Sequence, residues 1–75
     1  KLSYKDQRDL EQAPARIAAL EEEQAALQAR LQDPAFYSLA REESAPVLAR
    51  LQALAAELPK AYERWEALEA MADGA

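Results

Sequence analysis

Residues 47–68 carry the pattern that most constrains the fold of this chain. Their apolar side chains are separated alternately by four and three positions, which is the heptad repeat of a coiled coil and not the alternation of a strand. With Leu51 at heptad position a, the seam consists of Val47, Leu51, Leu54, Leu58, Ala61, Trp65 and Leu68. A single apolar stripe of this kind is not stable alone in water, so we expect a second helix to cover it.

Residues 10–31 repeat the same spacing and supply that second stripe. Its members are Leu10, Ala13, Ile17, Leu20, Gln24, Leu27 and Leu31. In an antiparallel pair, opposed residues have numbers with a constant sum, and a sum of 78 pairs every member of one stripe with one of the other. Large residues then face small ones, since Trp65 meets Ala13 and Ile17 meets Ala61. The sequence predicts an all-α fold, a two-helix antiparallel coiled-coil hairpin, in which polar Gln24 fixes the register.

Capping residues and prolines predict where the first helix begins and ends. Ser3 followed by Asp6 fits an N-cap, and Asp33 before Pro34 is a helix stop, because a residue that precedes proline avoids the α region. We therefore expect the first helix over about residues 4–32, continuous but bent at Pro14.

The connection over residues 33–45 is expected to be ordered and to carry a short helical turn with Pro34 at its first position. Ser44 is the predicted N-cap of the second helix, which we expect over about residues 46–72. Pro59 should kink this helix near residues 55–59 without reversing the chain, because the apolar seam keeps its phase through it.

The composition limits what such a domain can do. The 75 residues include no Cys and no His, which excludes a disulfide framework and argues against a structural zinc site. The runs Glu21 to Glu23 and Glu42 to Glu43 are predicted to face solvent, and a two-helix rod offers them no concave pocket. No apolar run approaches the ~20 residues that span a bilayer. We expect one domain over residues 1–75, without catalytic or metal sites, in a soluble cytoplasmic protein.

The distribution of charge indicates what the surface of the domain could bind. A net charge of −5 disfavours broad binding to nucleic acid unless cations gather locally. In the predicted register, the g positions that flank the seam bring together residues of like charge: Arg30 near Arg50, Glu23 near Glu57, and Arg16 near Arg64. Two interpretations remain open. The arginine stems could cover the alanine-rich seam with their heads in water, or the basic bands could hold phosphates.

The opposite flank, at the e positions, is apolar. Tyr62 is predicted to pack on Pro14, and Leu48 to receive an aromatic side chain from the connection. If Leu48 stays uncovered, this flank is a docking surface for a partner. The predicted partner-binding residues are Phe36, Tyr37, Leu48 and Tyr62.

Three stretches carry a resemblance to a known family. These are KLSYKDQRDLEQAPARIAALE at the start, LQARLQDPAFYS at the end of the first helix and in the connection, and AYERWEALEA near the end. Together they cover nearly the whole chain and resemble the C-terminal coiled-coil domain of Uup-type ABC-F ATPases. Pro59 departs from the uninterrupted run that precedes the Tyr-x-Arg-Trp region in that family. The absence of an initial Met also leads us to expect a piece of a longer protein.

The resemblance implies a parent with two ATP-binding cassettes that use ATP and magnesium. It implies that this domain, which lacks the ATPase motifs, has no cofactor and no enzymatic activity of its own. DNA is the implied partner, with RNA or the ribosome as a further candidate, and binding would follow the backbone and not the base sequence. The residues expected to contact nucleic acid are Lys5, Arg8, Arg16, Arg30, Arg41, Arg50 and Arg64.

Two alternatives remain beside DNA binding. The first is a protein-interaction rod that docks on the parent's own ATPase domains or on the ribosome through the apolar flank. The second is a homodimer formed by swapping the seam, although the constant sum of 78 favours closure within one chain and hence a monomer.

Overall fold

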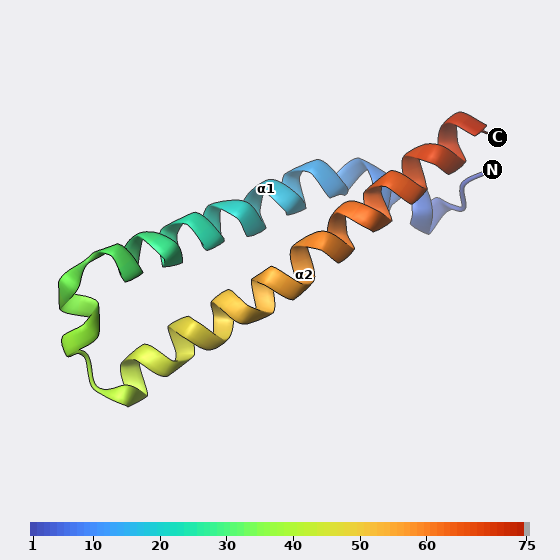
Figure 1. The fold of residues 1–75 in the computed structure, drawn as a ribbon. Coiled ribbons are helices and arrows are strands. Elements are labelled where there is room, and N and C mark those ends of the chain that lie inside the picture. Colours follow the sequence, from blue (N-terminus) through green and yellow to red (C-terminus); the bar gives the residue numbers. More distant parts are fainter. Residues whose placement is uncertain (75) are drawn as a thin grey trace.

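The computed structural model describes residues 1–74 and shows two long helices joined by a short connection. Helix α1 spans Tyr4–Gln32, the 3-10 helix η1 spans Pro34–Ser38, and α2 spans Arg41–Gly74. The helices run antiparallel and form a rod of 54 × 17 × 15 Å, with both ends of the chain at the same end of the rod (Figure 1). No strand occurs in residues 1–74. The predicted all-α coiled-coil hairpin is confirmed.

The capping residues act as the sequence predicts in α1. The Ser3 hydroxyl accepts a hydrogen bond of 3.1 Å from the Asp6 amide, so one of the free amides of the first turn is satisfied. At the other end, the Asp33 side chain accepts from the Ala35 amide at 2.9 Å and thereby caps η1, which has Pro34 at its start. The same residue therefore ends α1 and begins the connection.

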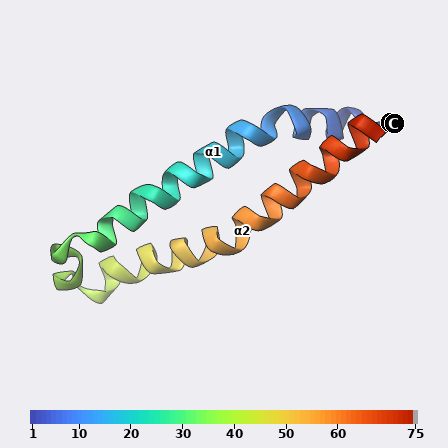
Figure 2. The ribbon, with the colours of Figure 1, turned by 45° about the horizontal axis from the view of Figure 1, so that its top comes forward.

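Three prolines lie inside the helices without interrupting them. Pro14 is in α1, and Pro46 and Pro59 are in α2; each lacks the amide hydrogen that would bond to a carbonyl one turn earlier. Figure 2 shows that α2 changes direction about midway, where the ribbon passes from gold to orange, and that α1 also curves. The predicted kink near Pro59 is confirmed, and the helix continues through it.

The start of α2 differs from the prediction. The helix begins at Arg41, and the carbonyl of Ala40 accepts from the amides of Glu43 and Ser44 at 2.9 and 3.0 Å. The predicted N-cap at Ser44 is therefore wrong. Glu42 and Glu43 occupy the first turn, where the interaction of carboxylates with the helix dipole stabilises the helix. The chain therefore becomes helical well before Pro46.

The two heptad stripes form the core. Every one of the fourteen seam residues is buried or half-buried, whereas most of their neighbours are exposed. Leu54 and Leu68 have no exposed surface, and Ile17 keeps only 4%. Ile17 and Ala61 line one hollow between the helices, as a sum of 78 requires. Gln24 is half-buried in the seam, and its role in fixing the register stays a prediction.

Trp65 is half-buried in the seam and packs beside the tyrosine one turn away. Its ring centroid is 6.3 Å from that of Tyr62. The predicted packing of Trp65 over Ala13 stays a prediction.

The connection folds back on the end of α1. Phe36 is buried and meets the Tyr37 ring edge-on at 5.4 Å, while the Tyr37 hydroxyl donates to the Leu31 carbonyl at 2.9 Å. That bond satisfies one of the last carbonyls of the helix. Leu48 keeps 49% of its surface exposed, and its predicted contact with an aromatic ring of the connection stays a prediction.

Replacing a core leucine tests the seam. Leu54→Ala removes a fully buried side chain from a thin core, so we expect the free energy of unfolding to fall by about 2–5 kcal/mol. Leu48→Ala makes the same chemical change at a half-exposed position and should cost no more than about 0.5 kcal/mol. Urea denaturation followed by circular dichroism measures both. Equal losses in the two variants would contradict the assignment of the core.

Candidate nucleic-acid interface

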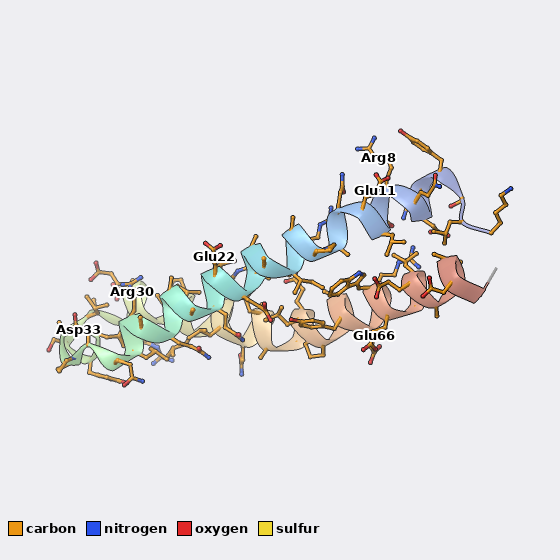
Figure 3. All side chains as sticks on the ribbon, turned by 90° about the horizontal axis from the view of Figure 1, so that it is seen from above. Arg8, Glu11, Glu22, Arg30, Asp33 and Glu66 are labelled. Atoms are coloured by element: carbon orange, nitrogen blue, oxygen red, sulfur yellow. The ribbon has the colours of Figure 1, made fainter. Side chains whose placement is uncertain are left out.

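The basic residues of α1 gather on one side of the helix. At 100° per residue, its four cations fall within about 80° of arc. They are Lys5, Arg8, Arg16 and Arg30. Figure 3 shows Arg8 and Arg30 near opposite ends of α1, with Glu22 between them. This side continues onto α2, because the g positions of the two helices border the same edge of the seam.

We call this edge the g flank. It consists of Asp9, Arg16, Glu23, Arg30, Arg50, Glu57 and Arg64. The opposite edge, the e flank, carries Arg41, Leu48, Ala55 and Tyr62 of α2, with Glu21 of α1.

Arg50 is paired, contrary to the predicted like-charge band. Its Nε and Nη2 atoms each donate to a carboxylate oxygen of Glu23 at 2.7 Å, and its Nη1 lies 3.8 Å from Glu57. The hydrogen bond from Arg50 lowers the pKa of Glu23, and the same bond raises the pKa of Arg50. Arg50 therefore bonds to Glu23, which lies one heptad before Arg30, the residue predicted to be its neighbour on α1.

Arg64 is paired as well. Its Nη2 atom donates to Asp6 at 2.8 Å and to Asp9 at 3.4 Å, and Lys5 donates to the same Asp9 at 3.1 Å. The hydrogen bond from Lys5 is the main cause of the lowered pKa of Asp9, and Arg64 lowers it further. Arg16 and Arg64 line the same hollow, as the predicted register requires, but the charge of Arg64 is met by acids of the first two turns of α1.

The other cations have no carboxylate partner among residues 1–74. Arg8 bonds to the Tyr4 hydroxyl at 3.2 Å, Arg16 bonds to Gln12 at 3.3 Å, and Arg30 lies over the Phe36 ring at 6.0 Å. These partners are neutral, so each guanidinium keeps its full charge for an external anion. Arg41 and Lys60 are also exposed and form no ion pair with the described part of the chain. Lys60 is missing from the predicted set, although it stands one turn before Arg64.

The e flank is partly apolar and partly polar. Leu48 lies in a shallow groove lined by Arg41, Ser44, Ala45, Ala49 and Gln52. Of the four predicted partner-binding residues, Phe36 is buried, whereas Tyr37, Leu48 and Tyr62 remain exposed. The Tyr62 hydroxyl donates to Glu21, which raises the pKa of Tyr62. This hydrogen bond joins the two helices, and the predicted packing of Tyr62 on Pro14 stays a prediction.

Metal and membrane sites can be assessed for the described residues only. Residues 1–74 contain no cluster of three or more acidic, histidine or cysteine side chains suited to a metal ion. None of the described helices is long and apolar enough to cross a membrane.

The chain belongs to the family described as the ABC transporter C-terminal domain, which it matches over residues 1–70. The resemblance to Uup proteins is confirmed by three relatives. The chain is 47% identical to the ATP-binding protein Uup of Escherichia coli K12, with 99% of the chain covered. It is 46% identical to the Uup-like protein and to the Uup protein of Haemophilus influenzae, with 99% and 92% covered. The chain spans only 12%, 17% and 11% of the lengths of these relatives.

A solved structure agrees with the fold. It is the structure of the C-terminal domain of a Uup protein, which is described as a DNA-binding coiled coil motif. The two chains are 46% identical and superpose with a TM-score of 0.91, over 99% of this chain and 87% of the other.

The pairing of Glu23 with Arg50 predicts a pH dependence. Because the pKa of Glu23 is lowered from its ordinary 4.5 in the folded state, the unfolded chain binds the proton first as pH falls. The pair therefore stabilises the hairpin above pH 4.5, and this stability is lost as pH falls through the lowered pKa. We expect the melting temperature to drop between about pH 7 and about pH 3, and to drop less in Glu23→Gln.

Glu22→Gln is the matched control, because Glu22 is exposed and makes no ion pair within residues 1–74. Its acid sensitivity should equal that of the unmodified chain. If Glu23→Gln and Glu22→Gln responded alike to acid, the pair across the helices would not form in solution.

Proposed function

We propose that this domain binds DNA through the g flank, as a module without chemistry of its own. The observation that carries the proposal is the solved Uup domain described as a DNA-binding coiled coil, with a TM-score of 0.91 at 46% identity. A chain with a net charge of −5 needs a local basic surface for this purpose. The supporting surface is the side of α1 that carries Arg8, Arg16 and Arg30, with Lys60 of α2 beside it.

The ion pairs within the hairpin indicate which of the predicted DNA-contacting cations are free to bind a phosphate. Arg16 and Arg30 hold only neutral partners, so a phosphate can bind them without displacing a carboxylate. Arg50 and Arg64 would have to share or exchange their acids, and therefore contribute less. We place Arg16 and Arg30 first among the contacts, with Arg8 and Lys60 beside them. Lys5 ranks with Arg50 and Arg64, because it is paired with Asp9. We place Arg41 outside the interface, on the e flank.

The remaining parts of the proposal concern the parent protein. We propose that ATP and magnesium bind to the ATPase domains outside this chain, which spans only 12% of its E. coli relative. The hairpin would be monomeric, because its two seams close on each other, and would work in the cytoplasm.

A second role is favoured by one observation, the exposed surface of Leu48 and Tyr37 at the tip of the rod. These apolar groups lie off the g flank. They could dock the hairpin on its own ATPase domains while the g flank holds DNA. Chemical-shift changes confined to Leu48 and Tyr37 when the ATPase domains are added would support this role, and unchanged shifts would contradict it.

Removing the two unpaired g-flank arginines tests DNA binding. In the double variant Arg16→Gln, Arg30→Gln, we expect duplex DNA to bind at least about tenfold more weakly at low salt. The slope of log K against log salt should shrink by about 1 for each residue removed. Fluorescence anisotropy at several salt concentrations measures both quantities.

Arg41→Gln is the matched control, because it removes one exposed arginine from the other flank. It should leave the affinity within about twofold of the unmodified chain. Binding that is unaffected by the double variant, or that falls equally in the control, would contradict the g flank as the interface. Absence of DNA binding by the unmodified chain at low salt would contradict the function itself.

A further inference from the structure

Three arginines of α1 stand at unequal intervals along the rod. They are Arg8, Arg16 and Arg30, and none is paired with a carboxylate of residues 1–74. Because α1 is continuous and rises about 1.5 Å per residue, the first interval is about 12 Å and the second is about 21 Å. The outer two arginines are therefore about 33 Å apart along the helix. Figure 3 shows them near opposite ends of α1.

The rod is too thick to enter a groove of duplex DNA. It measures 17 × 15 Å across, whereas the major groove is about 12 Å wide and admits a single helix. A bound duplex must therefore meet the rod with its sugar–phosphate backbones. Contacts of this kind position a protein on DNA without reading the base sequence.

The backbones of B-form DNA also recur at unequal intervals. Along a line parallel to the axis the two strands alternate, and the pattern repeats with each turn of about 34 Å. The minor groove is about 6 Å wide and the major groove about 12 Å, so dividing the turn in that proportion gives intervals of about 11 and about 23 Å. The three arginines, at about 12 and about 21 Å, have nearly the same spacing.

Two acids on this side of α1 fall within the longer interval. Glu22 and Glu23 follow Arg16 by six and seven positions, which places them about 10 Å along that interval. A duplex aligned with the arginines would turn its major groove toward this level, so no backbone phosphate would lie against the two carboxylates. Glu23 is in addition paired with Arg50. The basic and acidic bands of the rod thus match the alternation of backbone and groove.

We propose that the domain binds B-form duplex DNA lengthwise, with Arg8, Arg16 and Arg30 on three successive crossings of the backbone. The inference rests on the proposed DNA binding and adds to it the form of nucleic acid that fits. Double-stranded RNA is A-form, with a narrow major groove and a wide minor groove, so its backbones recur at other intervals. The domain should therefore prefer a DNA duplex to an RNA duplex of the same length.

The test moves one arginine along α1 without changing the composition. The double variant Gln12→Arg, Arg16→Gln exchanges two exposed side chains that are hydrogen-bonded to each other and lie on the same side of the helix. The exchange keeps the net charge but changes the intervals to about 6 and about 27 Å.

The DNA probe is a duplex of about 16 base pairs, which matches the 54 Å length of the rod at about 3.4 Å per pair. We expect it to bind the double variant at least about fivefold more weakly than the unmodified chain at low salt. The slope of log K against log salt should shrink by about 1, because one phosphate contact is lost. Fluorescence anisotropy measures both quantities, and circular dichroism checks that the variant is folded.

Arg41→Gln, Gln52→Arg is the matched control. It exchanges the same two residue types between exposed positions of α2 that line the groove at Leu48, on the e flank. Its affinity for the duplex should stay within about twofold of the unmodified chain. If the exchange in α1 also left the affinity and the salt slope unchanged, only the number of cations would matter, and the inference would be wrong.

An RNA duplex of the same length tests the inference without any variant. At equal salt, we expect the unmodified chain to bind it at least about fivefold more weakly than the DNA duplex. This difference should become smaller in the double variant, whose arginines no longer match B-form DNA. Equal binding of the DNA and RNA duplexes by the unmodified chain would overturn the inference.

The inference and the proposed function can fail separately. If the DNA duplex binds, but the exchange in α1 has no effect and RNA binds equally well, DNA binding stands and the lengthwise alignment is wrong. If no DNA binds the unmodified chain even at low salt, the proposed function is wrong, and the inference that rests on it is wrong as well.

Discussion

The closure of two heptad seams on each other is the constraint on which the rest of this structure depends. A chain of 75 residues rich in alanine has little apolar area to bury, and a hairpin concentrates that area along one line. The seam residues Leu54 and Leu68 are fully covered, while most residues outside the seam are exposed. The position of every charged group follows from this arrangement, because each heptad position has a fixed place relative to the partner helix.

The ion pairs across the g flank affect the charge of this surface more than the stability of the hairpin. Pairs between half-exposed side chains contribute little to stability in general. Their main effect is to occupy Arg50 and Arg64 with internal carboxylates, which leaves Arg16 and Arg30 as the g-flank arginines that keep neutral partners. A chain with an acidic total can thus keep a basic surface along one side of one helix.

The sequence alone predicts the seam because burial follows heptad spacing directly. Heptad spacing does not predict the partner of a long side chain that can reach several neighbouring residues. Arg50 has no acid four positions away, yet its length lets it reach Glu23 on the other helix, and no periodicity encodes that reach. The start of α2 is misplaced because Pro46 resembles a first-turn proline, whereas the helix-forming residues before it extend the helix to Arg41. The contact between the Trp65 and Tyr62 rings depends on side-chain packing that spacing does not encode.

We propose that the g flank, and not the e flank, meets DNA. The most direct measurement is an NMR titration of the chain with duplex DNA at low and at higher salt, in which the arginine side-chain and leucine methyl signals are followed. We expect the signals of Arg16 and Arg30 to shift when DNA is added and to return as salt is raised, while those of Arg41 and Leu48 stay in place. Shifts centred on Arg41 and Leu48, or changes that do not respond to salt, would contradict it.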